Sequence, residues 1–299
     1  MRITNKVLSD GFLRNLSNNL NQMQKYQNQL SSGKEVSRPS DNPLLVAKIM
    51  SMNNNILQNE QYNSNISDTL GWVKTQDTAL GDATQTLHRI KDLMIYGANG
   101  SLSDTDRSAI VEEVKMAKEQ LRDILNTNFD GRYIFGGQKT TDKPFDLDND
   151  GKLVYSGDDN NISREISQGV EVNLISDGGK IIQSDGIDLG VLIDETLQAL
   201  TNGDSEVLTG ENGLLGDMEN ITDNVVRVRT QIGAIHNRLE AAEERNRSEN
   251  LNLKELLSER EDIDVAEKYM EYMVMSTTYQ ASLSVGAKIL QPSLLDYLR

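Results

Sequence analysis

Apolar residues recur three and four positions apart near both ends of the chain. This spacing puts them along one side of an α-helix, and a narrow apolar stripe is typical of helices that pair with other helices. The first such helix is predicted near residues 7–30, and its stripe includes Leu13, Leu16, Leu20, Met23 and Leu30. The clearest stripe follows residue 214 and comprises Met218, Ile221, Val225, Val228, Ile232, Ile235, Leu239 and Ala242.

A third stripe lies near the end of the chain and is diluted by two polar residues. It comprises Ala266, Tyr269, Met273, Ser276, Gln280, Leu283, Ala287 and Leu290. Because the first and last segments both carry stripes, we expect them to pair with each other and with neighbouring subunits. The predicted assembly interface consists of Leu13, Leu16, Leu20, Met23, Leu30, Tyr269, Met273, Leu283, Leu290, Leu294 and Leu295.

The segments between these stripes divide into helical and β-rich parts. A helix is predicted from about residue 44 to 96, with a bend or local break at Gly71 or Gly81. Ser103, followed three residues later by Asp106, is typical of the cap of another helix. Residues 130–185 carry short alternating strands and turn signals, including Asp177-Gly178-Gly179. A short helix over 189–200 follows, and the long helix after 214 is expected to break at 262–264.

The predicted fold class is therefore mainly α. It is an elongated helical bundle or coiled coil made by the paired N- and C-terminal regions, with an inserted small β-rich domain. We assign residues 1–43 and 264–299 to terminal assembly segments that are disordered in the monomer. Residues 44–129 and 212–263 form the helical part, and 130–211 form the β-rich domain, which we expect to hang off the helices as a separate body.

Composition narrows the possible functions. Apolar residues make up 37% of the chain and the formal net charge is −16, which argues against nucleic-acid binding. Residues 130–211 contain 17 acidic and 6 basic residues, so most of the imbalance lies there. Without cysteine, disulfides and thiol-based zinc sites are excluded. No segment has the apolar length of a membrane span, and no cleavable secretory signal is visible.

One segment carries part of a metal-binding pattern. Asp146, Asp148 and Asp150, with Gly151 in the sixth position, match the first half of a calcium loop, but the twelfth position is Gly157 instead of a bidentate Glu. A plain Asp-rich hairpin turn accounts for the same residues. His88 and His236 lie beside apolar stripe positions without other ligands. No pattern builds a nucleophile, an oxyanion hole or a cofactor site, so we expect neither an enzyme nor a bound cofactor.

Two terminal motifs resemble the signatures of the bacterial flagellin superfamily. Leu30-Ser31-Ser32-Gly33-Lys34 and Arg38-Pro39-Ser40-Asp41-Asn42-Pro43 are similar to its amino-terminal signature, although Asn42 stands where the family usually has Asp. Residues 279–283 and 290–299 are similar to its carboxyl-terminal signature. Residues 131–137, followed by Pro144-Phe145, resemble the start of the variable domain in the hook–filament junction proteins of that superfamily.

The resemblance implies a structural adaptor of the bacterial flagellum that joins the hook to the filament. It implies extracellular localisation after export in the unfolded state through the flagellar type III apparatus, without signal cleavage. The implied partners are copies of the chain in a ring, a neighbouring hook-associated protein, flagellin, and an export chaperone on the C-terminal segment. It also implies a helical rod and an outward-facing β-rich domain, without nucleic acid or membrane insertion.

Two other functions remain open on the sequence. The chain could be a flagellin that forms the filament itself. It could also be a secreted ligand- or calcium-binding protein that acts through residues 130–211. Only the partial calcium loop supports the second alternative.

Overall fold

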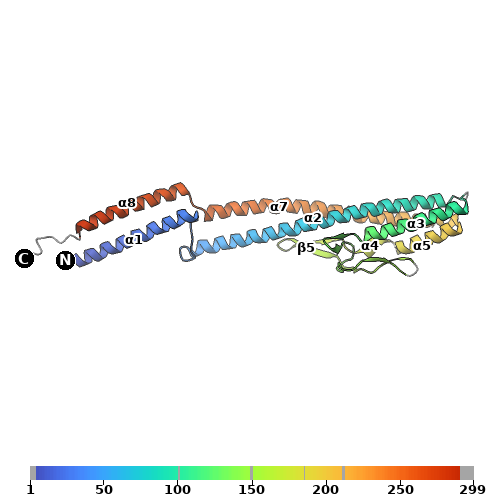
Figure 1. Ribbon diagram of the computed structural model, residues 1–299, viewed down its shortest axis with the longest axis horizontal. Coiled ribbons are helices and arrows are strands. Elements are labelled where there is room, and N and C mark those ends of the chain that lie inside the picture. The colour runs from blue at the N-terminus through green and yellow to red at the C-terminus, as the bar shows by residue number, and fades with distance from the viewer. Residues whose placement is uncertain (1–4, 100–101, 149–150, 185, 211–212, 290–299) are drawn as a thin grey trace, which may run out of the picture. The chain divides into compact units, whose positions relative to one another are not determined.

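The computed structural model describes residues 5–99, 102–148, 151–184, 186–210 and 213–289. Long helices dominate it: α1 (Asn5–Ser32), α2 (Pro43–Gly97), α3 (Asp104–Leu125), α7 (Leu214–Glu261) and α8 (Val265–Ile289) (Figure 1). The chain forms two compact units, one from residues 1–58 with 249–299 and one from residues 59–248. The predicted class, mainly α with a β-rich insert, is confirmed. None of the described helices is apolar over the length that a membrane crossing needs.

The helix boundaries follow the capping residues. Asn42 Oδ1 accepts a hydrogen bond from the Leu45 N–H at 3.1 Å, so this Asn caps α2. Ser103 caps α3, and its side chain accepts from the Asp106 N–H, as predicted. Asp264 Oδ1 accepts from the Ala266 N–H at 2.9 Å, which begins α8 after the predicted break. These polar caps satisfy N–H groups that the first turn of a helix leaves unpaired.

No local break interrupts α2 at its glycines. The helix is continuous through Gly71 and Gly81. A β-carbon at Gly71 would lie 2.7 Å from Cζ of Phe129, so the missing side chain lets the β-rich segment approach the helix closely. The glycine at this position serves packing, which the local sequence pattern does not reveal.

The β-rich insert is built from antiparallel pairs of short strands within the described residues. β5 (Ile162–Ser167) pairs with β6 (Val170–Leu174), with Ile162 opposite Leu174. β3 (Phe145–Leu147) pairs with β4 (Leu153–Tyr155). Two smaller pairs join β1 (Asn128–Phe129) to β2 (Arg132–Tyr133) and β7 (Gln183–Ser184) to β8 (Ile187–Asp188). The predicted alternating strand at 170–174 is confirmed.

Short helices complete the insert. They are α4 (Gly178–Ile182), α5 (Leu189–Asn202) and α6 (Ser205–Thr209). The predicted turn at Asp177-Gly178-Gly179 is wrong, because Asp177 caps α4 with its carboxylate. The helix predicted at 189–200 is confirmed, and Gly203 ends it in the left-handed region with a φ of 77°.

The insert and the helices of the second unit share one hydrophobic core. Ile134, Phe135 and Phe145 are fully buried in the same cluster as Leu80 and Leu87 of α2. The expectation of a separate body hanging off the helices is therefore wrong. The predicted stripe of α7 faces this core: Met218, Ile221, Val225, Val228, Ile232, Leu239 and Ala242 are buried, and Ile235 is half-buried.

Buried amide side chains tie the insert to the helices. Gln76 of α2 is fully buried, and its Nε2 donates to the carbonyl oxygens of Ile134 at 3.1 Å and Ile175 at 2.7 Å. Asn224 of α7 donates to three carbonyl oxygens between residues 180 and 183. Since irregular segments have few internal partners for their carbonyls, these amides supply them.

Candidate assembly surfaces

The first and last helices lie side by side in the first unit (Figure 1). Their contact stripes are only half-buried and include polar residues. On α1 the stripe comprises Phe12, Leu16, Asn19, Met23, Tyr26 and Leu30, and on α8 it comprises Lys268, Tyr272, Met275, Tyr279 and Ser282. A β-carbon at Gly286 would overlap the Phe12 ring, so the two helices approach each other closely there.

Backbone and side-chain bonds join the segment after α1 to the break before α8. The Glu35 N–H donates to the Glu261 carbonyl at 2.7 Å, and the Ile263 N–H donates to the Gly33 carbonyl at 3.1 Å. Lys34 forms an ion pair with Glu261. Gly33 has a φ of 73°, which lets the chain turn out of α1 toward these partners. The signature residues Gly33 and Lys34 thus fix where the two terminal helices meet.

A small polar cluster around Lys268 links α8 to α1 and to the segment that follows α1. Lys268 Nζ lies 3.4 Å from a Glu35 carboxylate oxygen, 3.1 Å from Glu271, and 5.8 Å from the centroid of the Tyr26 ring. Two effects oppose each other at Lys268. Burial is the largest single effect and by itself would lower the pKa of this side chain. The Glu271 and Glu35 carboxylates together outweigh burial, so the net pKa is raised. The ammonium is therefore held in its charged form between two acids and an aromatic face.

The structure divides the predicted interface residues between two faces. Leu16, Met23 and Leu30 lie on the stripe of α1 that contacts α8. Leu13 and Leu20 are exposed on α1, and Tyr269, Met273 and Leu283 are exposed on α8. Leu290, Leu294 and Leu295 lie outside the described residues. Their common role in assembly stays a prediction.

The stripe of α8 that packs on α1 is therefore not the stripe expected from the sequence. Both stripes obey the same spacing, because apolar residues occur around the whole circumference of α8. Between Tyr272 and Ala287 the sequence carries no charged residue. Spacing selects a buried face only when the opposite face is polar. The small side chains of Ser282 and Gly286 allow the close approach that selects the observed face.

The described residues of the partial calcium loop lie in β3 and directly beside the β3–β4 strand pair. Asp146 lies opposite Val154 in the strand pair, and Asp148 Oδ1 accepts from the Lys152 N–H at 2.8 Å. Asp150 lies outside the described residues. Across the described ranges, no three His, Asp or Glu residues gather where they could hold a metal ion. His88 is exposed, and His236 is half-buried with its Nδ1 3.7 Å from a Glu240 oxygen.

The geometry defines a class: mainly α proteins whose two terminal helices pair and flank a helical part with a β-rich insert. The sequence description of the bacterial flagellin N-terminal helical region matches residues 3–140, and that of the bacterial flagellin C-terminal helical region matches residues 215–298. The chain belongs to the bacterial flagellin family.

Individual relatives match nearly the whole chain. The flagellar hook-associated protein 3 of Escherichia coli (strain K12) is 27% identical over 303 residues, which cover 94% of this chain and 95% of the relative. A flagellin of Bacillus subtilis (strain 168) is 25% identical over 294 residues, covering 96% of both chains. A solved structure of a flagellar hook-associated protein from Vibrio parahaemolyticus shares the fold, with a TM-score of 0.67 and 23% identity over 74% of this chain and 100% of that one.

Proposed function

We propose that this chain is a structural subunit of the bacterial flagellum that joins the hook to the filament, and that it assembles through α1 and α8. The likeness to hook-associated protein 3 over nearly the full length of both chains supports the junction role. The exposed apolar surface of the two terminal helices supports the mode of assembly.

That surface is the observation that carries the proposal. Among the described side chains of α1 and α8, no apolar side chain is fully buried. Tyr269, Met270 and Val274 are 55%, 62% and 67% exposed, and Leu13 is 52% exposed. Clustered apolar surface of this kind marks a protein–protein contact. A helix that is apolar on every side becomes stable when other helices cover it.

The same surface accounts for the expected disorder of the ends in the monomer. The described residues within 1–43 and 264–299 bury little apolar area, so burial offsets little of the entropy lost on ordering. We propose that they order fully on assembly, that 44–129 and 212–263 form the rod, and that 130–211 face outward. Limited proteolysis of the monomer should remove both ends first and leave a core near residues 45–260.

The proposed partners are copies of this chain in a ring, a neighbouring hook-associated protein on one side and flagellin on the other. Before export the C-terminal segment binds a flagellar chaperone, which would cover the apolar residues of α8. The chain is then exported unfolded, without cleavage of a signal peptide. The absence of cysteine is compatible with this route, since no disulfide has to form outside the cell.

The test replaces one exposed leucine of α8. Leu283→Asp puts a carboxylate where a neighbouring subunit would exclude water, which costs on the order of several kcal/mol unless the charge is paired. Val226→Asp in α7 is the matched control, because both side chains are 44% exposed. We expect both purified monomers to fold, and cells with Leu283→Asp to carry bare hooks, release flagellin into the medium and lose motility. Normal filaments on Leu283→Asp cells, or an unfolded Leu283→Asp monomer, would contradict assembly through this face.

A second candidate is a filament subunit, and the full-length likeness to a Bacillus subtilis flagellin favours it. Immunogold labelling of intact flagella separates the two. A junction protein gives a single label where the hook ends, whereas a flagellin is labelled along the whole filament.

A further inference from the structure

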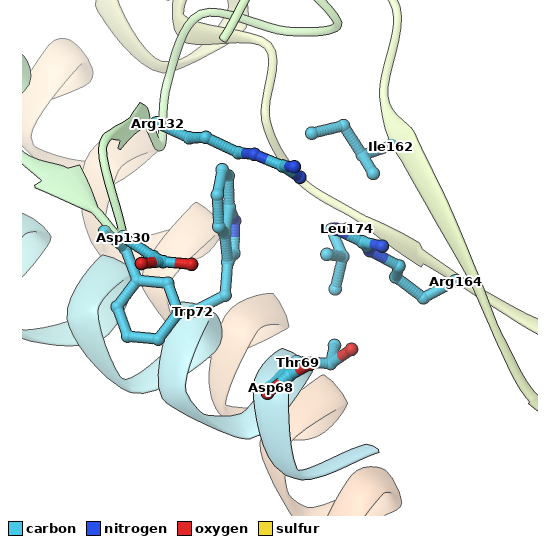
Figure 2. Close-up of a pocket in the computed structure, with 9 residues that line it drawn as sticks. Asp68, Thr69, Trp72, Asp130, Arg132, Ile162, Arg164 and Leu174 are labelled. Carbon is cyan, nitrogen blue, oxygen red and sulfur yellow. The ribbon is translucent and has the colours of Figure 1, made fainter. Parts of the chain in front are cut away.

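A cavity of about 600 Å³ opens in the second unit between α2 and the β-rich insert. Its lining comes from three separate stretches of sequence, and Figure 2 shows how they converge. The lining residues are Asp68, Thr69, Trp72, Phe129, Asp130, Arg132, Ile162, Arg164 and Leu174. This volume lies within the range of small-ligand sites in proteins.

Trp72 forms one wall of the cavity. The side chain is only 5% exposed and packs edge-to-face on Phe129, with ring centroids 6.2 Å apart. Its Nε1 is buried and has no hydrogen-bond partner within the described part of the chain. Figure 2 shows this nitrogen on the ring edge that faces Arg132, Ile162 and Arg164. The nitrogen has no exposed surface, so the indole contributes an apolar wall to the cavity and not a hydrogen-bond donor.

Two arginines point into the same space. Arg132 comes from β2, and Arg164 comes from β5, where the two-residue period places it on the same strand face as Ile162. Figure 2 shows both guanidinium groups directed toward the space beside Trp72. Neither arginine forms an ion pair or a side-chain hydrogen bond with any described residue. In the same view Asp130 lies on the opposite side of the indole ring from Arg164.

We propose that this cavity binds a carboxylate carried on an apolar body. A carboxylate matches the planar fork of a guanidinium, which can donate two parallel hydrogen bonds to it. Trp72, Phe129, Ile162 and Leu174 supply apolar walls for the rest of the ligand. Asp68 and Asp130 also line the cavity, but within the described residues neither forms an ion pair with Arg132 or Arg164, so both guanidinium groups stay available to an anionic ligand. The site lies apart from α1 and α8 in the sequence and is independent of the proposed assembly function.

The sequence provides a built-in reporter, because Trp72 is its only tryptophan. The full-length protein is titrated with N-acetyl-leucine, which carries a free carboxylate, and with its uncharged amide. We expect a saturable change in tryptophan fluorescence below about 10 mM with the carboxylate alone, which corresponds to binding in the millimolar range. The same change with the amide would show that the carboxylate is not recognised and would overturn the proposal. No change with N-acetyl-leucine would exclude a free small carboxylate, and the peptide pair described next then decides the proposal.

A second pair of probes identifies the source of the carboxylate. One is a blocked tripeptide of leucine, glutamate and leucine, and the other is its glutamine counterpart. Binding of the glutamate peptide but not of N-acetyl-leucine assigns the site to a side chain of a polypeptide. The reverse result assigns it to a free small carboxylate. Both results support the proposal, and binding of neither probe overturns it.

Variants locate the binding. Arg132→Gln and Arg164→Gln should each raise the dissociation constant about tenfold, which corresponds to about 1.4 kcal/mol. Arg164→Lys keeps the charge but loses the planar fork, so it should recover only part of the affinity. Arg247→Gln, at an exposed position of α7, is the matched control and should bind like the wild type. Unchanged affinity in both glutamine variants, with circular dichroism showing intact folds, would remove the two arginines from the site and refute the proposal.

Discussion

Gln76 is expected to hold the β-rich insert on α2, and Gln76→Leu tests this. The substitution keeps the side-chain volume but removes both hydrogen bonds to the Ile134 and Ile175 carbonyls. A buried carbonyl left without a partner costs about 1–3 kcal/mol. The Gln76 Oε1 atom has no partner within the described residues, so its removal offsets part of that loss. We expect the free energy of unfolding to fall by about 2–4 kcal/mol.

Urea unfolding followed by Trp72 fluorescence measures this change, because Trp72 lies one helical turn before Gln76. Gln85→Leu is the control, since Gln85 is exposed on the same helix and its replacement should change stability by no more than about 0.5 kcal/mol. If both variants unfold at the same urea concentration, the amide does not hold the insert, and the shared core rests on apolar packing alone.

Two further predictions follow from the second unit. Replacing residues 135–205 with a short linker should abolish cooperative thermal unfolding, because Phe135 and Phe145 belong to the same core as α2. Circular dichroism measures the transition. A cooperative transition at the wild-type temperature would mean that the helices fold without the insert. Tyr155 should weaken the fold at alkaline pH. Burial raises its pKa to about 12, against an opposing hydrogen bond from the Gly178 N–H. The folded state thus retains the phenol proton more tightly than the unfolded state, so stability is full below about pH 10 and falls between about pH 10 and 12. Tyr155→Phe should flatten this part of the urea-unfolding profile, and an unchanged profile would assign the loss to other groups.

The sequence predicts elements well where polar and apolar positions alternate with one clear period. The α7 stripe from Met218 to Ala242 is buried as expected, because charged residues occupy the other faces of that helix. In α8 the same reasoning identifies a helix, but the stripe that it singles out is not the one that contacts α1. Apolar residues surround it, so the period alone does not distinguish Tyr269 and Met273 from Tyr272 and Met275.

Contacts between distant segments account for what the sequence could not predict. Asn and Gln are abundant in α1 and α2, so nothing in the local pattern singles out Gln76 as a buried donor. Asp177-Gly178-Gly179 suits both a hairpin turn and a helix cap, and the tertiary contacts of Gly178 with Phe135 and Phe145 favour the cap. The cavity likewise requires Trp72, Arg132 and Arg164 to come together, although Trp72 and Arg164 are 92 positions apart in the sequence.

The two units differ in where their stabilisation comes from, and this difference bears on function. The second unit buries Leu80, Phe135 and Met218 in a core of its own. In the first unit, α8 keeps most of its described apolar side chains exposed, and α1 exposes Val7, Leu13 and Leu20. The contact between the two helices relies on half-buried residues and the polar cluster at Lys268. Substitutions in the second unit should therefore alter the stability of the monomer. Substitutions on the exposed faces of α1 and α8 should leave that stability unchanged and act on assembly, as expected for a subunit whose terminal helices complete their packing only among neighbours.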